Sequence, residues 1–347
     1  MFLIALRDLQ FRLRRFVISV VAVALVLALT IVLAGVAASL DIEVDRTLDQ
    51  IGVDTWVVDS NASGPFFGAV PMNEANVEQI RALDGVTEAQ PQVFYPYTLN
   101  SPSGPQSITL FGGAPGELGT PHPDEGRGLE NPGEALAQPV HGMQLGSTAQ
   151  IGGKSFKIVG TFHDSTMLGG IANVFVSTQD LQEIAFKGAP VITAVAISGS
   201  PTQPLDGMKT VDRADARTDL IRPLKSVKQT ISLLSVLLWI VTGCIIGSVI
   251  YLSALERSRD FAVFKAIGVS NMSVLLGLVL QAVLLSVLAA GAAVLIARLL
   301  APAMSVPVAF PTAILVLVPI TAVVVSVIGS LAGVRRAVRV DPALAFG

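Results

Sequence analysis

Residues able to hold a metal, a nucleotide or a reaction intermediate are few in this sequence. None of the three histidines stands at metal-ligand spacing, and the one cysteine, Cys244, has no partner for a disulfide. The stretch 151–155, IGGKS, has the Gly-Lys-Ser end of a phosphate-binding loop. Thr148 replaces the glycine that such a loop needs five residues before its Gly-Lys pair. We therefore expect no catalytic residue, no bound cofactor and no metal site in this chain, which is not an enzyme by itself.

One charged stretch does carry a clear helical pattern. Leu255–Ser270 reads LERSRDFAVFKAIGVS and lies between two long apolar runs. Four of its residues share one helical face: Phe261, Phe264, Lys265 and Gly268. An aromatic face ringed by charges is typical of a helix that docks in the groove of a partner protein. It is equally typical of a loop that lies on anionic lipid. The residue types alone leave both interpretations open.

The elements that position this stretch are apolar runs. Four are long enough to cross a bilayer: 16–40, 231–255, 273–297 and 312–334. A helix of 25 residues, the length of the second and third runs, exceeds the roughly 30 Å of a hydrocarbon core. The runs hold almost no ionisable group, which argues against transport driven by protons or sodium. Energy should therefore come from a partner.

Charge on the short loops predicts the orientation. Ten basic and four acidic residues lie in 1–15, 256–272 and 335–347, whereas the rest of the chain is acidic. Because basic short loops stay in the cytoplasm, both termini and the 256–272 linker should be cytoplasmic and 41–230 extracytoplasmic. The first run is too long for the core of a cleaved signal peptide, so we interpret it as a retained span.

The 190 residues between the first two spans predict a mixed α and β domain. We expect the first helix to continue through 41–50 as a stalk and a kinked helix, 206–229 with Pro223 inside, to lead into the second span. The other expected elements are a strand at 54–59, a helix at 74–83 capped by Asn73, a strand at 86–93, and short strands at 107–111, 156–162, 172–176 and 191–197.

A pair of aromatic residues, Phe66 and Phe67, stands in a turn-rich loop of this domain. It could touch lipid or a partner, or it could form a small core beneath the loop, and we favour the core.

The linker also carries a family resemblance. Glu256-Arg257-Ser258-Arg259-Asp260 followed by Lys265-Ala266-Ile267-Gly268-Val269-Ser270 resembles the "ER-x-x-E … K/R-A-L/I-G-A/V-S/T" segment of the MacB/FtsX/LolC-type (type VII) ABC transporter permeases. The tail RRAVRVDPALAFG is similar to the family's "R-R-A-x-R-x-D-P-x-x-A-L" ending. One departure is Asp260-Phe261-Ala262, where the family usually has Glu-Ile-Gly.

The resemblance implies a fold class and a site. The expected protein is an α-helical integral membrane protein with four transmembrane helices and a large α+β extracytoplasmic domain between the first and second helices. In the family, the linker is a coupling helix that sits on the ATPase subunit. The residues assigned to this contact are Glu256, Arg257, Arg259, Asp260, Phe261, Phe264, Lys265 and Gly268.

The resemblance also implies the order of the segments along the chain. It is an amphipathic cytoplasmic helix 1–15, transmembrane helices 16–40, 231–255, 273–297 and 312–334, an extracytoplasmic domain 41–230, a cytoplasmic coupling helix 256–272 and a basic cytoplasmic tail 335–347. Within 41–230, we expect a porter-like core, 41–98 with 198–230, and a β-rich insert, 99–197.

By resemblance, the chain is the permease subunit of an ABC transporter in a bacterial plasma membrane. The implied partners are two copies of an ATPase that holds ATP and Mg, a second permease copy in a homo- or heterodimer, membrane lipids and an envelope accessory protein, with no nucleic acid. The Phe66-Phe67 loop before Pro71 and Met72 resembles the DevC-like branch, which implies a hydrophobic or lipid-linked substrate. The alternatives are an FtsX-like signalling or scaffold protein that regulates an envelope enzyme, and transport of a small solute such as an amino acid.

Overall fold

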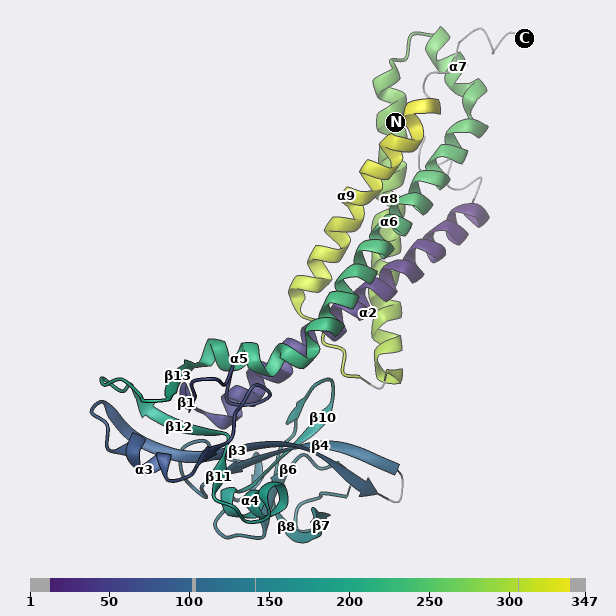
Figure 1. Ribbon diagram of the computed structural model, residues 1–347. Coiled ribbons are helices and arrows are strands. Elements are labelled where there is room, and N and C mark those ends of the chain that lie inside the picture. Colours follow the sequence, from purple (N-terminus) through teal and green to yellow (C-terminus); the bar gives the residue numbers. More distant parts are fainter. Residues whose placement is uncertain (1–12, 102–103, 141, 305, 338–347) are drawn as a thin grey trace. The chain divides into compact units, whose positions relative to one another are not determined.

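The computed structural model describes residues 13–101, 104–140, 142–304 and 306–337 (Figure 1). The chain divides into two compact units, Met1–Ala38 with Val227–Gly347, and Ser39–Ser226. We call them the helical unit and the sheet unit. The predicted N-terminal helix 1–15 and the tail 335–347 lie for the most part outside the described residues.

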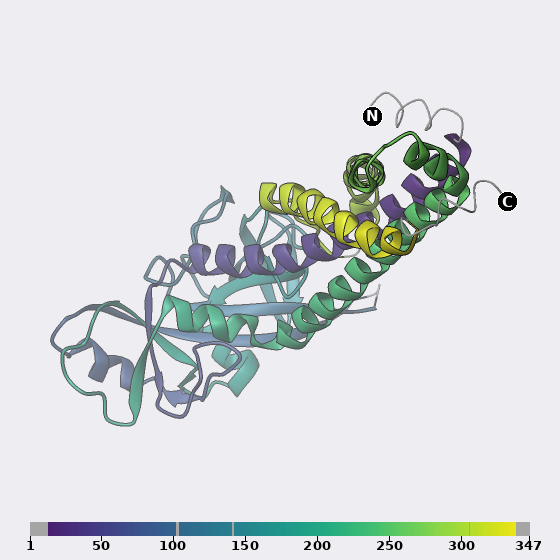
Figure 2. The ribbon, with the colours of Figure 1, turned by 90° about the horizontal axis from the view of Figure 1, so that it is seen from above.

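The helical unit is a bundle of long apolar helices (Figures 1 and 2). Within the described ranges, four helices are long and apolar enough to cross a membrane, as predicted. They are α2 (Leu13–Ile51), α6 (Lys225–Glu256), α8 (Asn271–Leu300) and α9 (Thr312–Ala337). Alanines of α8, including Ala282, Ala289 and Ala293, are fully buried in the bundle core. Small side chains there let the helices approach closely.

Glycines set the crossing of α6 and α9. A Cβ atom on Gly247 would lie 2.9 Å from the carbonyl oxygen of Gly329, and one on Gly329 would lie 2.7 Å from that of Gly243. The two backbones therefore touch at this crossing. Gly243 and Gly247 form the small-xxx-small spacing that packs membrane helices together, and here they use it within one chain.

The sheet unit is built on one mixed eleven-stranded sheet in the order β13-β1-β12-β3-β4-β10-β6-β8-β5, with β7 on β8 and β9 on β10. The strands are β1 (Thr55–Asp59), β3 (Val86–Ser101), β4 (Gly104–Gly113), β5 (Glu125–Gly126), β6 (Glu134–Ala137), β7 (Thr148–Ile151), β8 (Lys154–Thr161), β9 (Thr166–Met167), β10 (Ile171–Ser177), β12 (Ala194–Gly199) and β13 (Met208–Asp212). β2 (Met72–Asn73) pairs separately with β11 (Val191–Ile192). The predicted α+β class is confirmed.

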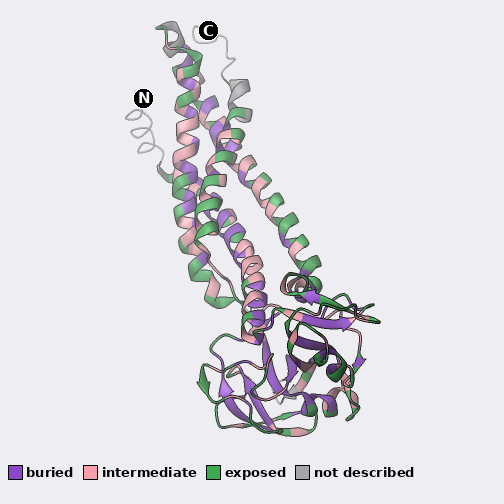
Figure 3. Ribbon diagram, turned by 90° about the vertical axis from the view of Figure 1, so that its left-hand side faces the viewer, coloured by how far each residue is buried: buried purple, intermediate pink, exposed green. Residues whose placement is uncertain are grey.

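Alternation along the strands produces two cores in the sheet unit. Trp56 and Val58 of β1 are buried in one apolar cluster, while Val57 between them is buried in the other. Successive side chains of a strand point to opposite faces, so each face must be covered. Helices α3 (Asn76–Arg81), α4 (Thr178–Phe186) and α5 (Arg213–Ile221) belong to this unit, whose strands are largely buried in Figure 3.

Several predicted elements differ from the structure. Asn73 lies in β2 and caps no helix, because α3 begins at Asn76 and its N-cap residue, Ala75, makes no side-chain cap hydrogen bond. Residues 208–212 of the predicted second stalk form β13, so its helical part begins at Arg213. The expected kink is present as a 3₁₀ turn, η1 (Arg222–Leu224), which contains Pro223.

The predicted limits of the β-rich insert do not coincide with a break in the sheet. β3 runs through residue 99 and pairs with β12 along its first half and with β4 along its second. The segment 191–197 is likewise divided between β11 and β12. Backbone pairing, which no hydropathy pattern encodes, joins the core and the insert in one sheet.

Candidate functional site

The predicted coupling segment forms a short helix, α7 (Ser258–Ala266), between α6 and α8. The α6 helix ends at Glu256, and the amide of Phe261 donates to the carbonyl of Arg257 at 2.9 Å as the new helix begins. Gly268 follows with φ +91°, a left-handed conformation that only glycine adopts at little cost. Ser270 then caps α8 by accepting a hydrogen bond from the amide of Ser273. These breaks give α7 a direction of its own.

The faces of α7 differ from the prediction in one respect. Phe261, expected on the docking face, is only 9% exposed and packs in the core of the bundle with Ala254 and Val274. The side chains of Phe264 and Lys265 lie outside those that the structure describes. Helical spacing identified an aromatic face, but it does not tell whether that face turns toward a partner or toward the chain's own bundle.

The exposed surface of α7 and its flanks is both charged and apolar. Glu256, Arg259 and Asp260 are exposed. Val263 and Ile267 are 55% and 72% exposed. Apolar side chains next to both signs of charge are the composition expected of a protein contact, since a purely lipid-facing loop would favour basic residues. We call these five residues the α7 face.

A second cluster lies in the sheet unit, where the end of α2 meets α5 (Figures 1 and 2). Arg217 Nε lies 2.6 Å from Asp45 Oδ1, and Arg217 Nη2 lies 3.1 Å from Asp41 Oδ1. One turn away, Arg213 pairs with Asp49. We call these five residues the stalk junction. It joins two helices that each continue along the chain into a transmembrane span.

The opposite side of α2 is held by the loop around β9. Glu43 accepts hydrogen bonds from the Thr166 hydroxyl at 2.9 Å and from the Gly169 amide at 2.8 Å. The buried amide of Asn173 donates to the Thr47 hydroxyl at 3.1 Å. The last three turns of α2 are therefore fixed on two sides within the sheet unit, as a rigid lever requires.

Sequence reasoning missed the stalk junction, although a signal for it exists. Asp41, Asp45 and Asp49 follow each other at intervals of four, as do Arg213 and Arg217. Residues four apart lie on one face of a helix. The acidic series on the first stalk and the basic series on the second suggest that the two stalks form ion pairs with each other, even though about 170 residues separate them along the chain.

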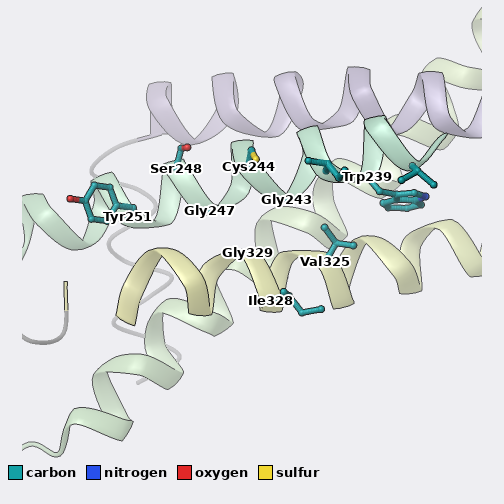
Figure 4. A pocket seen from close by; sticks show the side chains of 11 residues that line it. Trp239, Gly243, Cys244, Gly247, Ser248, Tyr251, Val325, Ile328 and Gly329 are labelled. Carbon is teal, nitrogen blue, oxygen red and sulfur yellow. The ribbon is translucent and has the colours of Figure 1, made fainter. Parts of the chain in front are cut away.

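Figure 4 shows an open groove in the helical unit, between α6 and α9. It has a volume of about 680 Å³. Its walls include Trp239, Gly243, Tyr251, Val325 and Gly329, and no Asp, Glu, Lys, Arg or His lines it. Some polar side chains in the spans bond to a neighbouring helix, as Gln281 does with Ser253 at 3.4 Å and Ser326 with Ser286 at 3.3 Å, and others, such as Thr242, donate to a carbonyl of their own helix. The groove therefore suits apolar contact.

Within the glycine-rich stretch 151–155, Gly152 and Gly153 form the turn between β7 and β8, as predicted. Its Lys154 ammonium pairs with the carboxylates of Asp180 and Glu183, and Asp180 is fully buried. That lysine is therefore committed to a structural pair. Among the residues that the structure describes, no group of three or more His, Cys, Asp or Glu side chains could hold a metal ion.

Two family models match successive parts of the chain. Residues 16–206 match the family model of the MacB-like periplasmic core domain, and residues 232–342 match that of the FtsX-like permease C-terminal domain. Two proteins of Mycobacterium tuberculosis H37Rv, named uncharacterized ABC transporter permeases Rv2563 and Rv0072, are 44% and 42% identical over 343 residues. Each alignment covers 99% of this chain and 98% of the relative.

A solved structure, the extracellular domain of the noncanonic ABC-type transporter YknZ from Gram-positive bacteria, aligns with a TM-score of 0.32 and 15% identity. That alignment covers 43% of this chain and 84% of the YknZ domain.

Proposed function

The chain belongs to the FtsX-like and MacB-like family of ABC transporter permeases, and we propose that it couples ATP hydrolysis by a separate ATPase subunit to movements of its sheet unit. It is a membrane protein with an extracytoplasmic domain. The observation that carries the proposal is chain continuity. α7 precedes α8 and directly follows α6, and α6 follows η1 and α5. A push on α7 would reach the stalk junction through α6, η1 and α5.

In this proposal, both termini and α7 lie in the cytoplasm, and residues 41–230 lie outside. The support is the excess of basic residues in 1–15, 256–272 and 335–347. An ATPase held on the cytoplasmic side can reach the α7 face only in this orientation.

The ATPase contact in this proposal is the α7 face, with Arg257, Phe264, Lys265 and Gly268 beside it. Phe261 has a different role from the one expected, because its burial fixes α7 to the bundle. ATP and Mg would be held by the partner. We further propose a dimer of permeases bound to two ATPase copies, as the resemblance implies.

The substrate that fits best is hydrophobic or lipid-linked. The groove between α6 and α9 is lined by apolar and small residues, and membrane-embedded carboxylates of the kind that ion-coupled carriers use are missing from the described part of the four spans. Such a substrate would be taken from the outer leaflet or from the extracytoplasmic space. The second candidate, an FtsX-like regulator of an envelope enzyme, uses the same ATPase coupling without a transported compound.

The test is purification of the tagged chain from its host in mild detergent, followed by mass spectrometry of the proteins that accompany it. The proposal predicts an ABC ATPase in equimolar amount. A third component that is a hydrolase would favour the regulatory function. If the chain stays folded in several detergents and no ATPase accompanies it, the proposal is wrong.

A further inference from the structure

The carboxyl group of Asp219, in the last turn of α5, is fully buried and holds a loop that is distant in the sequence. Its Oδ2 accepts a hydrogen bond from the backbone amide of Phe66 at 2.8 Å. Its Oδ1 faces Gly68 and lies 3.7 Å from the Arg222 guanidinium. A carboxylate is costly to bury, so its place here needs a reason other than packing.

The loop is shaped around this side chain. The amide of Ser63 donates to the carbonyl of Gly68 at 2.9 Å, which closes the loop 63–68 into a ring. A Cβ atom on Gly64 would lie 2.5 Å from Asp219 Oδ2, and one on Gly68 would lie 2.7 Å from Asp219 Oδ1. Only residues without a side chain can approach a carboxyl group so closely. Arg222 reaches the same loop and bonds to the Ser63 hydroxyl.

The loop inserts Phe66 into an aromatic cluster. The ring of Phe66 packs edge to face with Trp56 at 5.9 Å between centroids, with Phe94 at 5.5 Å and with Phe111 at 6.1 Å. The cluster continues from Phe111 through Phe175 across the sheet. A small displacement of Phe66 would therefore change the packing of several strands.

The position of Asp219 connects this loop to the chain that leads into the membrane. Arg222 is the third residue after it, at the point where α5 gives way to η1 and then to α6. We propose that Asp219 is a latch, which ties the loop 63–68 to the α5–η1 hinge. Movement of the hinge then shifts Phe66 against the other rings of the aromatic cluster. This inference rests on the proposed function for the source of the movement, while the latch itself is a property of the sheet unit.

Trp56 provides a direct reporter of the latch. The chain has two tryptophans, and Trp239→Phe leaves Trp56 alone, in contact with Phe66. The single-tryptophan protein, bound to its ATPase in lipid nanodiscs, is measured without nucleotide and with a non-hydrolysable ATP analogue. We expect the emission of Trp56 to change on nucleotide binding. Asp219→Asn should keep that change, because its amide oxygen accepts the same hydrogen bond, and Asp219→Ala should lose at least half of it.

Hydrogen exchange of the chain without its ATPase gives the second measurement. Asp219→Ala should speed exchange of the Phe66 amide on the order of tenfold, while the amides of β1 stay protected. The latch is disproved if this amide exchanges equally slowly in both proteins, or if Trp56 responds to nucleotide equally in both. The latch is also disproved if the emission of Trp56 in the protein with Asp219 intact does not change on nucleotide binding although the ATPase is bound. Failure of the ATPase to bind at all contradicts the proposed function instead, and the exchange result then decides on the latch alone.

Discussion

Arg217 Nε lies 2.6 Å from Asp45 Oδ1, and this pair fastens α5 to the last turns of α2. The two residues are 172 apart in the sequence, and each stands on a helix whose chain continues into a membrane span. We therefore expect movement of either span to be transmitted in part through this pair.

Removing Arg217 should loosen the stalk junction. Both side chains are partly exposed, so we expect Arg217→Ala to lower the free energy of unfolding by only about 1 kcal/mol. The larger effect should be faster hydrogen exchange in 213–221 and 39–51. Arg217→Lys should exchange faster than the wild-type protein and slower than Arg217→Ala, because an ammonium cannot donate to Asp41 and Asp45 with a planar fork. The charge-swapped double variant, Asp45→Arg with Arg217→Asp, should restore protection from hydrogen exchange. Hydrogen exchange that is unchanged in Arg217→Ala would show that the stalk junction does not hold α5 and α2 together.

Glu134 should make the sheet unit sensitive to acid. Its hydrogen bonds with Arg127 lower the pKa of Glu134 from 4.5 to about 2. Because the pKa is depressed in the folded protein, the stabilisation is present above pH 4.5 and is lost as the pH falls toward 2. We expect the melting temperature to drop over this range, and Glu134→Gln to show a smaller drop from a lower starting value. Parallel curves for the two proteins would contradict the assignment.

Two glycine substitutions should have opposite effects on the stability of the helical unit. Gly329→Ala places a methyl group 2.7 Å from the carbonyl of Gly243 and should destabilise the helical unit by about 1–3 kcal/mol. Gly291→Ala on α8 meets nothing within 4 Å and should stabilise its helix by up to about 1 kcal/mol. Thermal aggregation in detergent measures both. Equal behaviour of the two variants would mean that the backbones of α6 and α9 do not touch.

The orientation in the membrane is tested with single cysteines. In a Cys244→Ser background, Gln144→Cys should react with an impermeant maleimide on intact cells, and Ile267→Cys should react only after permeabilisation. Both positions are exposed. The reverse labelling pattern would invert the proposed topology.

The sequence was enough to predict some elements of the fold and not others. The four spans were predictable because lipid requires only a long apolar run. The Phe66 and Phe67 loop was correctly predicted to pack inward, since two adjacent aromatic rings are costly to expose, but Phe66 lies in one of the two main cores of the sheet unit and not in a small core of its own. The order of the eleven strands was not predictable, because pairing between β4 and β10 or β6 and β8 depends on distant backbone contacts.

The candidate site shows the same limit at the level of single residues. The charges of the α7 face were identified from the sequence, but Phe261 was assigned to that face and is buried instead. A helical period identifies which residues share a face and leaves open what that face meets. The partners of Asp219 were equally hidden, because Phe66 contributes a backbone amide that no residue type reveals.

We propose above that the α7 face holds the ATPase. It is tested most directly by co-purification of the ATPase with the double charge reversal Arg259→Glu with Asp260→Lys, compared with the wild-type chain and with Lys209→Glu, an exposed residue of β13. We predict at least a tenfold loss of bound ATPase in the double variant and none in the control, with equal membrane insertion. Undiminished ATPase on the double variant would contradict the account and return α7 to the role of a lipid-facing loop.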